Sequence, residues 1–312
     1  MPKIEHGYLN KTIVRVQKPS DEHIFVSYSQ LSLFDNCPLQ WKLKYVDKIK
    51  LVDESIHTVF GTAIHTTIQN WIVILYTETV KKFNEFDFEA AFLAEMKSEY
   101  LASVKKNNDV HFSTKEQLSE YYLYGVEILK YLKSKRKLFF DRKNEELIGI
   151  EMPLYNKIGG VCFVSYLDAV FREKTTGKII IRDFKTSRSG WKYEKTNFIK
   201  TSQLVLYKMF YSELYDVPID DIEIEYIILK RIVNTDLAYP IPRVSKFSPA
   251  SGTVTRNKVK RLIDNFIESC FDNGKYKIDQ NYLAIAGINN YNCKFCPYSI
   301  REDLCPVKNR LK

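Results

Sequence analysis

The segment from Val161 to Lys185, VCFVSYLDAVFREKTTGKIIIRDFK, constrains the fold of this chain more than any other stretch. Two runs rich in β-branched and aromatic residues flank the polar stretch Lys174–Gly177, a pattern typical of a β-hairpin. If these four residues form the loop, Glu173 lies opposite Lys178. The loop therefore fixes which side chains of the two strands face one another.

Counting back from this loop places Asp168 opposite Asp183, with Lys185 on the same face because side chains alternate along a strand. Like charges directly opposed on a half-buried sheet are destabilising, so the pair needs a cation or one protonated carboxyl group. Mg²⁺ or Mn²⁺ suits carboxylate oxygens, polarises a phosphate and lowers the pKa of a bound water. Lys185 would orient that water or stabilise charge on the phosphate. The other interpretation is a surface hairpin with solvated charges, since Asp-x-Lys also occurs by chance.

The composition restricts the partners of this chain. Its 312 residues can bury a sizeable core, and 45% hydrophobic with 14% aromatic residues indicate a folded protein. A formal net charge of +9 and a pI near 9.0 favour an acidic partner such as nucleic acid. No apolar run approaches the roughly 20 residues of a membrane span, and the first residues lack the apolar segment of a secretion signal. We expect a cytoplasmic protein.

The spacing of the cysteines indicates a metal centre. Cys293, Cys296 and Cys305 form the pattern C-x2-C-x8-C in a turn-rich segment, a spacing that metal ligands use. Three thiolates leave a four-coordinate site one ligand short, whether it holds zinc or an iron–sulfur cluster. Cys37 stands apart, before a proline near the end of an amphipathic segment. The other two cysteines stand in apolar runs and are expected to be buried small hydrophobes: Cys162 and Cys270.

Apolar periodicity and capping signals predict the remaining elements. Residues 1–24 are expected to be irregular or an edge segment, and a helix beginning near Ser27 or Ser29 breaks at Pro38. Further helices are predicted over 61–81, with His65 in its first turns, and over 88–106, 115–140, 198–215 and 249–273. The β region begins at Met152, directly after Glu151, a possible supporting carboxylate, and further strands are predicted over 222–231 and 235–242.

Three polar features on these elements are candidates for function. His65 alone is more often a core or surface histidine than a ligand. Gln203 and Tyr207 are spaced i, i+4 on one helical face, where a glutamine is unexpected and needs a partner. The loop TSRSGWKYEKTN after Lys185 is basic and aromatic, so it either tracks a phosphate backbone and stacks on bases or is a solvated connector.

Taken together, these motifs resemble the RecB-like branch of the PD-(D/E)XK nucleases, which includes the nuclease domains of RecB and AddB and the CRISPR-associated RecB-like exonucleases. The matching pieces occur in the family's order over roughly residues 27–305. SYSQLSLFDNCPLQWKLKY resembles the N-terminal helix with its first cluster cysteine, GTAIH the G-x-x-x-H motif, and YLD the first aspartate strand. DFK resembles the (D/E)-x-K signature, QLVLY the Q-x-x-x-Y motif, and the tail the last three cluster cysteines. Each piece alone is weak, but six in register favour the functional interpretations.

The resemblance assigns roles to these residues. It implies that His65, Asp168, Asp183 and the Phe184 carbonyl are metal ligands and that Lys185 is the catalytic lysine. Gln203 and Tyr207 would support the site or contact DNA. A [4Fe–4S] cluster, or zinc as the alternative, would be held by four thiolates: Cys37, Cys293, Cys296 and Cys305. One departure is Ser165, which stands where the family often has glycine three residues before the first aspartate.

The resemblance also implies fold and activity. We expect an α/β protein with a restriction-endonuclease-like core, a central mixed sheet flanked by helices. It would form one compact nuclease unit: a helical region over 1–146, the nuclease core over 147–275 and the cluster segment over 276–312. The activity would be a Mg²⁺- or Mn²⁺-dependent exonuclease on single-stranded DNA ends in recombination, repair or replication, with helicase or recombination proteins as possible partners. The setting would be a bacterial or phage-infected cell. The alternative is a DNA-binding iron–sulfur clamp or recombination subunit with a dormant nuclease site.

Overall fold

The structure is a computed structural model that describes residues 24–49, 51, 54–234 and 241–312. These residues form two compact units that are interleaved along the chain. The first unit contains Glu54–Met152 and Tyr166–Ala250; the second contains Pro153–Ser165, Ser251–Lys312 and the described part of Arg15–Asp53. The predicted regions 1–146, 147–275 and 276–312 therefore stay predictions. No helix in the described ranges combines the length and apolar character that crossing a membrane requires.

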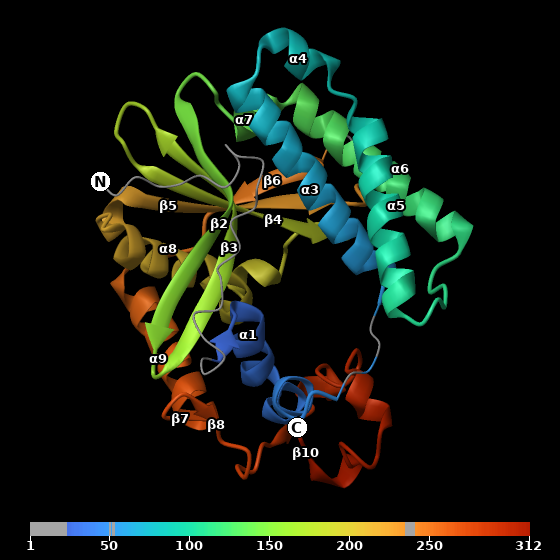
Figure 1. Cartoon of the computed structure of the whole chain (residues 1–312), viewed down its shortest axis with the longest axis vertical. Coiled ribbons are helices and arrows are strands. Elements are labelled where there is room, and N and C mark those ends of the chain that lie inside the picture. Colours follow the sequence, from blue (N-terminus) through green and yellow to red (C-terminus); the bar gives the residue numbers. More distant parts are fainter. Residues whose placement is uncertain (1–23, 50, 52–53, 235–240) are drawn as a thin grey trace. The chain divides into compact units, whose positions relative to one another are not determined.

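Six strands form a mixed sheet in the order β1-β3-β4-β5-β6, with β2 paired to β3 outside this path (Figure 1). The β3–β4 and β5–β6 pairs are antiparallel, whereas β1–β3 and β4–β5 are parallel. The strands are β1 (Phe25–Val26), β2 (Glu145–Ile158), β3 (Val161–Glu173), β4 (Ile179–Ser187), β5 (Ile222–Lys230) and β6 (Val244–Phe247). A mixed sheet flanked by helices agrees with the predicted fold class.

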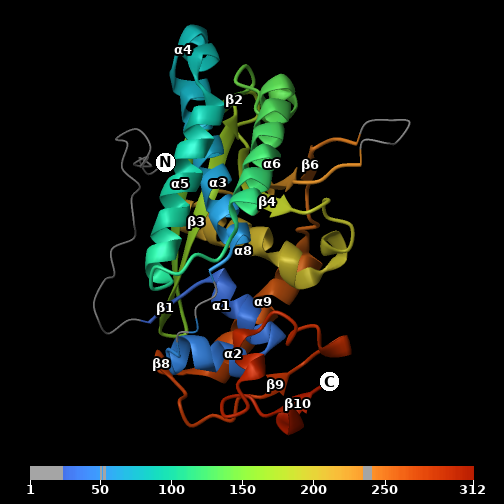
Figure 2. The same ribbon diagram turned by 90° about the vertical axis from the view of Figure 1, so that its right-hand side faces the viewer.

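Helices of the first unit cover both faces of β4 and β5. Phe60 and Ile64 of α3 belong to one buried cluster with Phe184 of β4 and Ile227 of β5. Tyr226, on the opposite face of β5, donates a 3.0 Å hydrogen bond to a backbone carbonyl of α8. Figure 2 shows α3, α5 and α6 as long neighbouring helices. The helices of this unit are α3 (Ile56–Thr77), α4 (Val80–Glu85), α5 (Phe88–Lys106), α6 (Lys115–Ser134), α7 (Arg136–Phe139) and α8 (Phe198–Tyr215).

The predicted register of the central hairpin is confirmed. Four consecutive pairs of β3 and β4 have this register, and the Glu173 amide donates to the Lys178 carbonyl at 2.8 Å. One further step along the same register brings Asp168 opposite Asp183. Along β4, Ile179–Phe184 are buried, whereas Lys185–Ser187 are partly exposed.

Two predicted starting points were wrong. The helix predicted from Gly61 begins at Ile56, because Ser55 caps it by accepting a 3.3 Å hydrogen bond from the Thr58 amide. His65 consequently lies in the third turn rather than the first turns. The β region begins at Glu145 rather than at Met152, and a buried acidic residue at the start of a strand gives no apolar signal.

The other predicted helices and strands differ less from the observed ones. The helix predicted over 115–140 is divided into α6 and α7, and α4 was not predicted. The helices predicted over 88–106 and 198–215 are confirmed as α5 and α8. Most of the strand predicted over 235–242 lies outside the described residues, and the next strand, β6, begins at Val244. Residues 1–23, predicted to be irregular or an edge segment, also lie outside the described residues.

The second unit is built around Trp41, which is fully buried. The rings of Phe34 and Phe266 lie 5.7 and 5.6 Å from it, so α1 and α9 pack through aromatic contacts. Its regular elements are α1 (Tyr28–Asn36), α2 (Pro38–Trp41), a π-helical turn (Lys42–Val46), α9 (Thr253–Cys270), and the short strands β7 (Phe271–Asp272), β8 (Lys275–Tyr276), β9 (Ala284–Ile285) and β10 (Arg310–Leu311). The helix predicted over 249–273 is therefore confirmed with shorter ends.

Candidate active site and cysteine pocket

Three elements of the first unit bring the predicted catalytic residues together. His65 comes from α3, Asp168 from β3, and Asp183 and Lys185 from β4. His65 Nδ1 lies 3.7 Å from Asp168 Oδ2, which also accepts a 2.7 Å hydrogen bond from the Phe184 amide. Lys185 Nζ lies 2.8 Å from Asp183 Oδ2 and forms an ion pair with it. The structure thus groups these residues, while their catalytic roles stay predictions.

Burial controls the protonation of these groups. It raises the pKa of Asp168 to about 7 and that of Asp183 to about 6, against the opposing effect of Lys185. Burial alone would lower the pKa of Lys185, but the two aspartates outweigh it and raise the pKa. Burial and Lys185 lower the pKa of His65 to about 4, so its imidazole is neutral at pH 7. A neutral imidazole beside carboxylates retains the lone pair that a metal ligand requires.

Two further residues join this group. Gln69 of α3 donates from Nε2 to Glu151 Oε1 and, at 3.4 Å, to the Asp168 backbone carbonyl. Glu151 was expected only as a supporting carboxylate, and burial together with Asp183 raises its pKa. Its φ of 50° is left-handed, a strained conformation for glutamate within a strand. Gln69 was missed, although it follows His65 by one helical turn and so lies on the same face.

The charge balance of this site fits a bound cation. Asp168 and Asp183 share the ammonium group of Lys185, and a third carboxylate, that of Glu151, adds its negative charge to both of them. The predicted Phe184 ligand is nearby, since the ring centres of His65 and Phe184 lie 5.9 Å apart and the Phe184 amide donates to Asp168. An excess of buried carboxylate over ammonium favours a hard divalent ion.

Gln203 and Tyr207 pair with each other on α8. Gln203 Nε2 donates a 2.7 Å hydrogen bond to the Tyr207 hydroxyl, so the predicted need for a partner is met by the second residue of the motif. One residue along, the Leu204 amide donates to the Tyr226 hydroxyl at 3.3 Å, and the Tyr226 ring centre lies 5.9 Å from Lys185 Nζ. Through Tyr226, this part of α8 supports the strand that carries Lys185.

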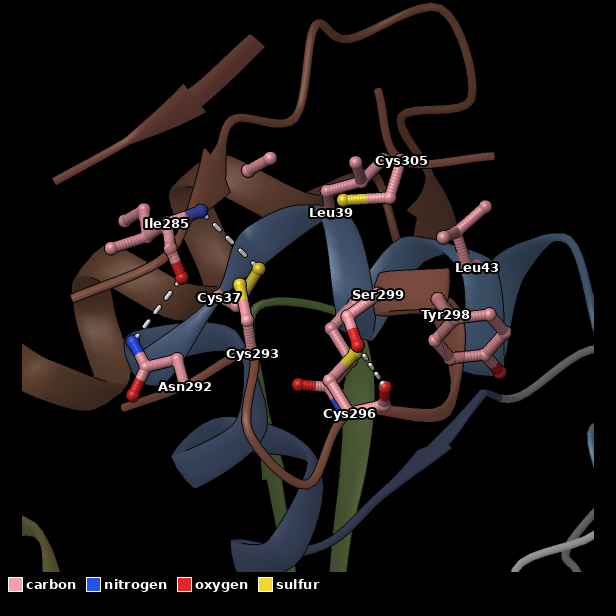
Figure 3. A pocket seen from close by; sticks show the side chains of 12 residues that line it. Cys37, Leu39, Leu43, Ile285, Asn292, Cys293, Cys296, Tyr298, Ser299 and Cys305 are labelled. Carbon is pink, nitrogen blue, oxygen red and sulfur yellow. Dashed lines mark hydrogen bonds between the residues drawn. The ribbon is translucent and has the colours of Figure 1, made fainter. Parts of the chain in front are cut away.

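The four predicted cysteines line one pocket of the second unit (Figure 3). Cys37 lies at the junction of α1 and α2, and its Sγ accepts a hydrogen bond from the Ile285 amide at 3.4 Å. Burial raises the pKa of Cys293 and of Cys296, and the neighbouring Cys37 and Cys305 add to both shifts. The remaining cysteines are buried, as predicted: Cys162 and Cys270.

Neither site has the closed geometry of a loaded metal centre. Within the described ranges, no group of three or more His, Cys, Asp or Glu side chains is arranged to hold a metal ion. The donor types at the two sites nevertheless differ as metal chemistry requires. Carboxylates and an imidazole suit Mg²⁺ or Mn²⁺, and four thiols suit zinc or iron.

The fold and the first site define the class of this protein. A mixed sheet with two aspartates and a lysine on adjacent strands is an arrangement for metal-assisted chemistry on phosphate esters. The sequence model of the PD-(D/E)XK nuclease superfamily matches residues 26–305, so the chain belongs to this superfamily. Members use divalent metals such as Mg²⁺ or Mn²⁺, and membership implies a metal-dependent nuclease with DNA as its substrate. No curated protein sequence matches the chain.

Proposed function

We propose that this nuclease is of the RecB-like type and acts as an exonuclease on single-stranded DNA ends in recombination, repair or replication. The observation that carries the proposal is the convergence of Asp168 and Asp183 on Lys185 in a chain that matches the superfamily over residues 26–305. The net charge of +9 supports an anionic substrate. Cytoplasmic location and helicase or recombination partners belong to the same proposal.

The chain's own groups have distinct tasks in this reaction. His65, Asp168, Asp183 and the Phe184 carbonyl would hold Mg²⁺ or Mn²⁺, which when bound polarises the scissile phosphate and acidifies a water. Lys185 remains protonated at neutral pH because the two aspartates raise its pKa. Its ammonium group therefore offers a fixed positive charge to a phosphate oxygen as negative charge develops there.

End-labelled DNA tests both the chemistry and the substrate. We expect a linear single strand to be shortened from an end in Mg²⁺ or Mn²⁺ and a closed single-stranded circle of the same sequence to be spared. A 5′ block reports the polarity, and duplex DNA and RNA of the same sequence report the preference. If the circle is cut as fast as the linear strand, the exonuclease assignment is wrong.

Substitutions in the hairpin test the site itself. Lys185→Ala and Asp183→Asn should each reduce cleavage by at least about 100-fold, since each removes a charge that acts on the reacting phosphate. Lys178→Ala is the matched control, because this partly exposed lysine on the same hairpin pairs with Glu223. Full activity in Lys185→Ala would contradict the mechanism. Binding without cleavage by the wild type would instead favour a DNA-binding clamp with a dormant site.

We further propose that the cysteine pocket holds a [4Fe–4S] cluster with a structural role, with zinc as the alternative. The support is that four thiols, one from residue 37 and three from residues 293–305, line one pocket. A metal clip between such distant segments closes a long loop, which restricts the unfolded chain.

A further inference from the structure

Beyond Lys185, β4 leads into a basic loop, residues 188–197, that connects it to α8. The last residue of β4, Ser187, is paired with Lys230 at the end of β5. At about 3.3 Å per residue, this pair lies about 7 Å along the strand from Lys185. The loop and the end of β5 are therefore within one or two nucleotides' reach of the candidate catalytic lysine.

Lys230 is held in place by the loop. Gly190 has a φ of 108°, which favours glycine, and a Cβ atom there would lie 2.9 Å from Lys230 Cε. Lys230 Nζ donates a 2.8 Å hydrogen bond to the Pro242 carbonyl. The close passage of the lysine stem over glycine fixes the position of this ammonium group beside the loop.

The positive charges of this region are not neutralised. Among the described residues, four basic side chains form no ion pair with an acidic group: Arg188, Lys192, Lys195 and Lys230, here called the basic loop cluster. Burial lowers the pKa of Lys230, and the positive charge of Lys195 lowers it further. The only acidic residue of the loop, Glu194, pairs instead with Lys200 at 3.5 Å.

Aromatic contacts join the loop to the catalytic strand. The Trp191 ring centre lies 4.8 Å from that of Tyr226, the same ring that lies beside Lys185. Lys195 Nζ lies 5.3 Å from the ring centre of Phe247 on β6. Tyr193, in contrast, is 73% exposed. A loop that is anchored by one aromatic residue and exposes another offers a stacking surface for an unpaired base.

We propose that the basic loop cluster binds the sugar-phosphate backbone of a single DNA strand leading away from Lys185, and that Tyr193 stacks on one of its bases. The proposal rests on the nuclease function proposed above and assigns the segment that holds its substrate. Neighbouring cations without acidic partners are stabilised by phosphates, and stacking on an exposed ring requires an unpaired base.

Binding of a labelled oligothymidylate, followed by fluorescence anisotropy in chelator at several salt concentrations, tests this assignment. Each phosphate contact to a single strand contributes about 0.7 to the slope of log affinity against log salt. Lys195→Ala/Lys230→Ala should therefore lower the magnitude of the slope by about 1.4 and raise the Kd about tenfold or more at low salt. Lys192→Ala/Lys195→Ala, at two exposed positions, repeats the test should Lys230→Ala impair folding.

Lys97→Ala/Lys137→Ala is the matched control, since it removes two exposed positive charges from α5 and α7. An unchanged slope in the loop variants, or an equal loss in this control, would overturn the proposal. Tyr193→Ala should weaken single-strand binding about tenfold without changing the slope; an equal loss with duplex DNA would overturn the stacking. Binding is measured in chelator, where no cleavage occurs, so the two proposals can fail separately. If the wild type cuts DNA but the loop variants keep its salt slope, only this inference is refuted. If the loop variants lose slope but the wild type never cuts DNA with metal, only the proposed function is refuted.

Discussion

At Asp168 and Asp183, burial opposes the charge that metal binding needs. Both pKa values are raised, to about 7 and about 6, because each carboxylate is taken out of water beside another. The metal-free site is therefore a source of instability that a bound cation relieves. His65 has the opposite sign, since its pKa falls to about 4 from an ordinary value of 6.5.

The directions of these pKa shifts predict how the stability of the fold depends on pH. A carboxyl group with a raised folded-state pKa contributes no penalty below its unfolded pKa of about 3.9, and its penalty grows as the pH rises towards 7. His65 contributes stability above pH 6.5 and loses it as the pH falls towards 4. Asp168→Asn removes the penalty of the buried carboxylate and leaves the effect of His65 in place. The asparagine can still accept the hydrogen bond of the Phe184 amide.

In chelator, Asp168→Asn should consequently be more stable than the wild type at pH 8 by at least ~1 kcal/mol, and the difference should shrink near pH 4. Thermal unfolding at the two pH values measures it. Adding Mg²⁺ at pH 8 should raise the Tm of the wild type more than that of the variant. The same stability difference at both pH values would contradict this account.

At the scale of the element, β4 is anchored by Arg182, which is 2% exposed between Ile181 and Asp183. Its guanidinium forms two 2.7 Å hydrogen bonds to Glu145 of β2 and one of 2.9 Å to Glu225 of β5. The Phe171 ring centre lies 4.7 Å from the guanidinium carbon. Arg182 thus links three strands at the position next to Asp183.

Arg182→Met should destabilise the protein by roughly 3–5 kcal/mol, because it leaves the buried Glu145 carboxylate without its cation, whereas Glu225 keeps its ion pair with Lys246. Glu145→Gln in the same chain should restore part of the loss. The matched control is Arg172→Met on the same hairpin, whose ion pair with Glu146 at 2.9 Å is partly exposed and contributes at most ~1 kcal/mol. Urea unfolding compares the three variants. Equal losses for the two arginines would show that burial of this pair is not what matters.

At the scale of the whole molecule, the chain has two kinds of candidate centre in two units. The carboxylate site lies within the first unit, and the cysteine pocket lies within the second. Both units are assembled from separate parts of the chain, because segments of the two units alternate along the sequence. Each therefore depends on contacts between residues that are distant in sequence.

The cysteine proposal predicts iron and sulfide in anaerobically purified protein, with the broad visible absorption of a cluster. Cys37→Ser and Cys305→Ser should lose both and should unfold at lower temperature. Cys162→Ser is the matched control, because this buried thiol contacts the Tyr155 hydroxyl at 2.9 Å and lies outside the pocket. Zinc without sulfide would select the alternative metal. Full iron retention in Cys37→Ser would remove that residue from the ligand set.

The sequence by itself determined the features that depend on local geometry. The pairing of Asp168 with Asp183 followed from the length of one loop and the alternation of side chains along a strand. The helices α5 and α8 followed from the pattern of apolar residues along the chain. The residues that give such signals are close together in the sequence, so a short stretch of sequence is enough to detect them.

Only the tertiary structure decided which distant residues meet. Gln69 meets Glu151 and the Asp168 carbonyl because α3 packs beside β2 and β3. The sequence places Gln69 on the helical face of His65 but does not show which strands that face contacts. Glu145 began a strand because Arg182, 37 residues away, neutralises it in the core. Cys37 lines one pocket with the C-terminal cysteines because packing of the second unit brings these distant segments together. These outcomes depend on how buried charge and volume are shared between segments, which is a property of the packed chain.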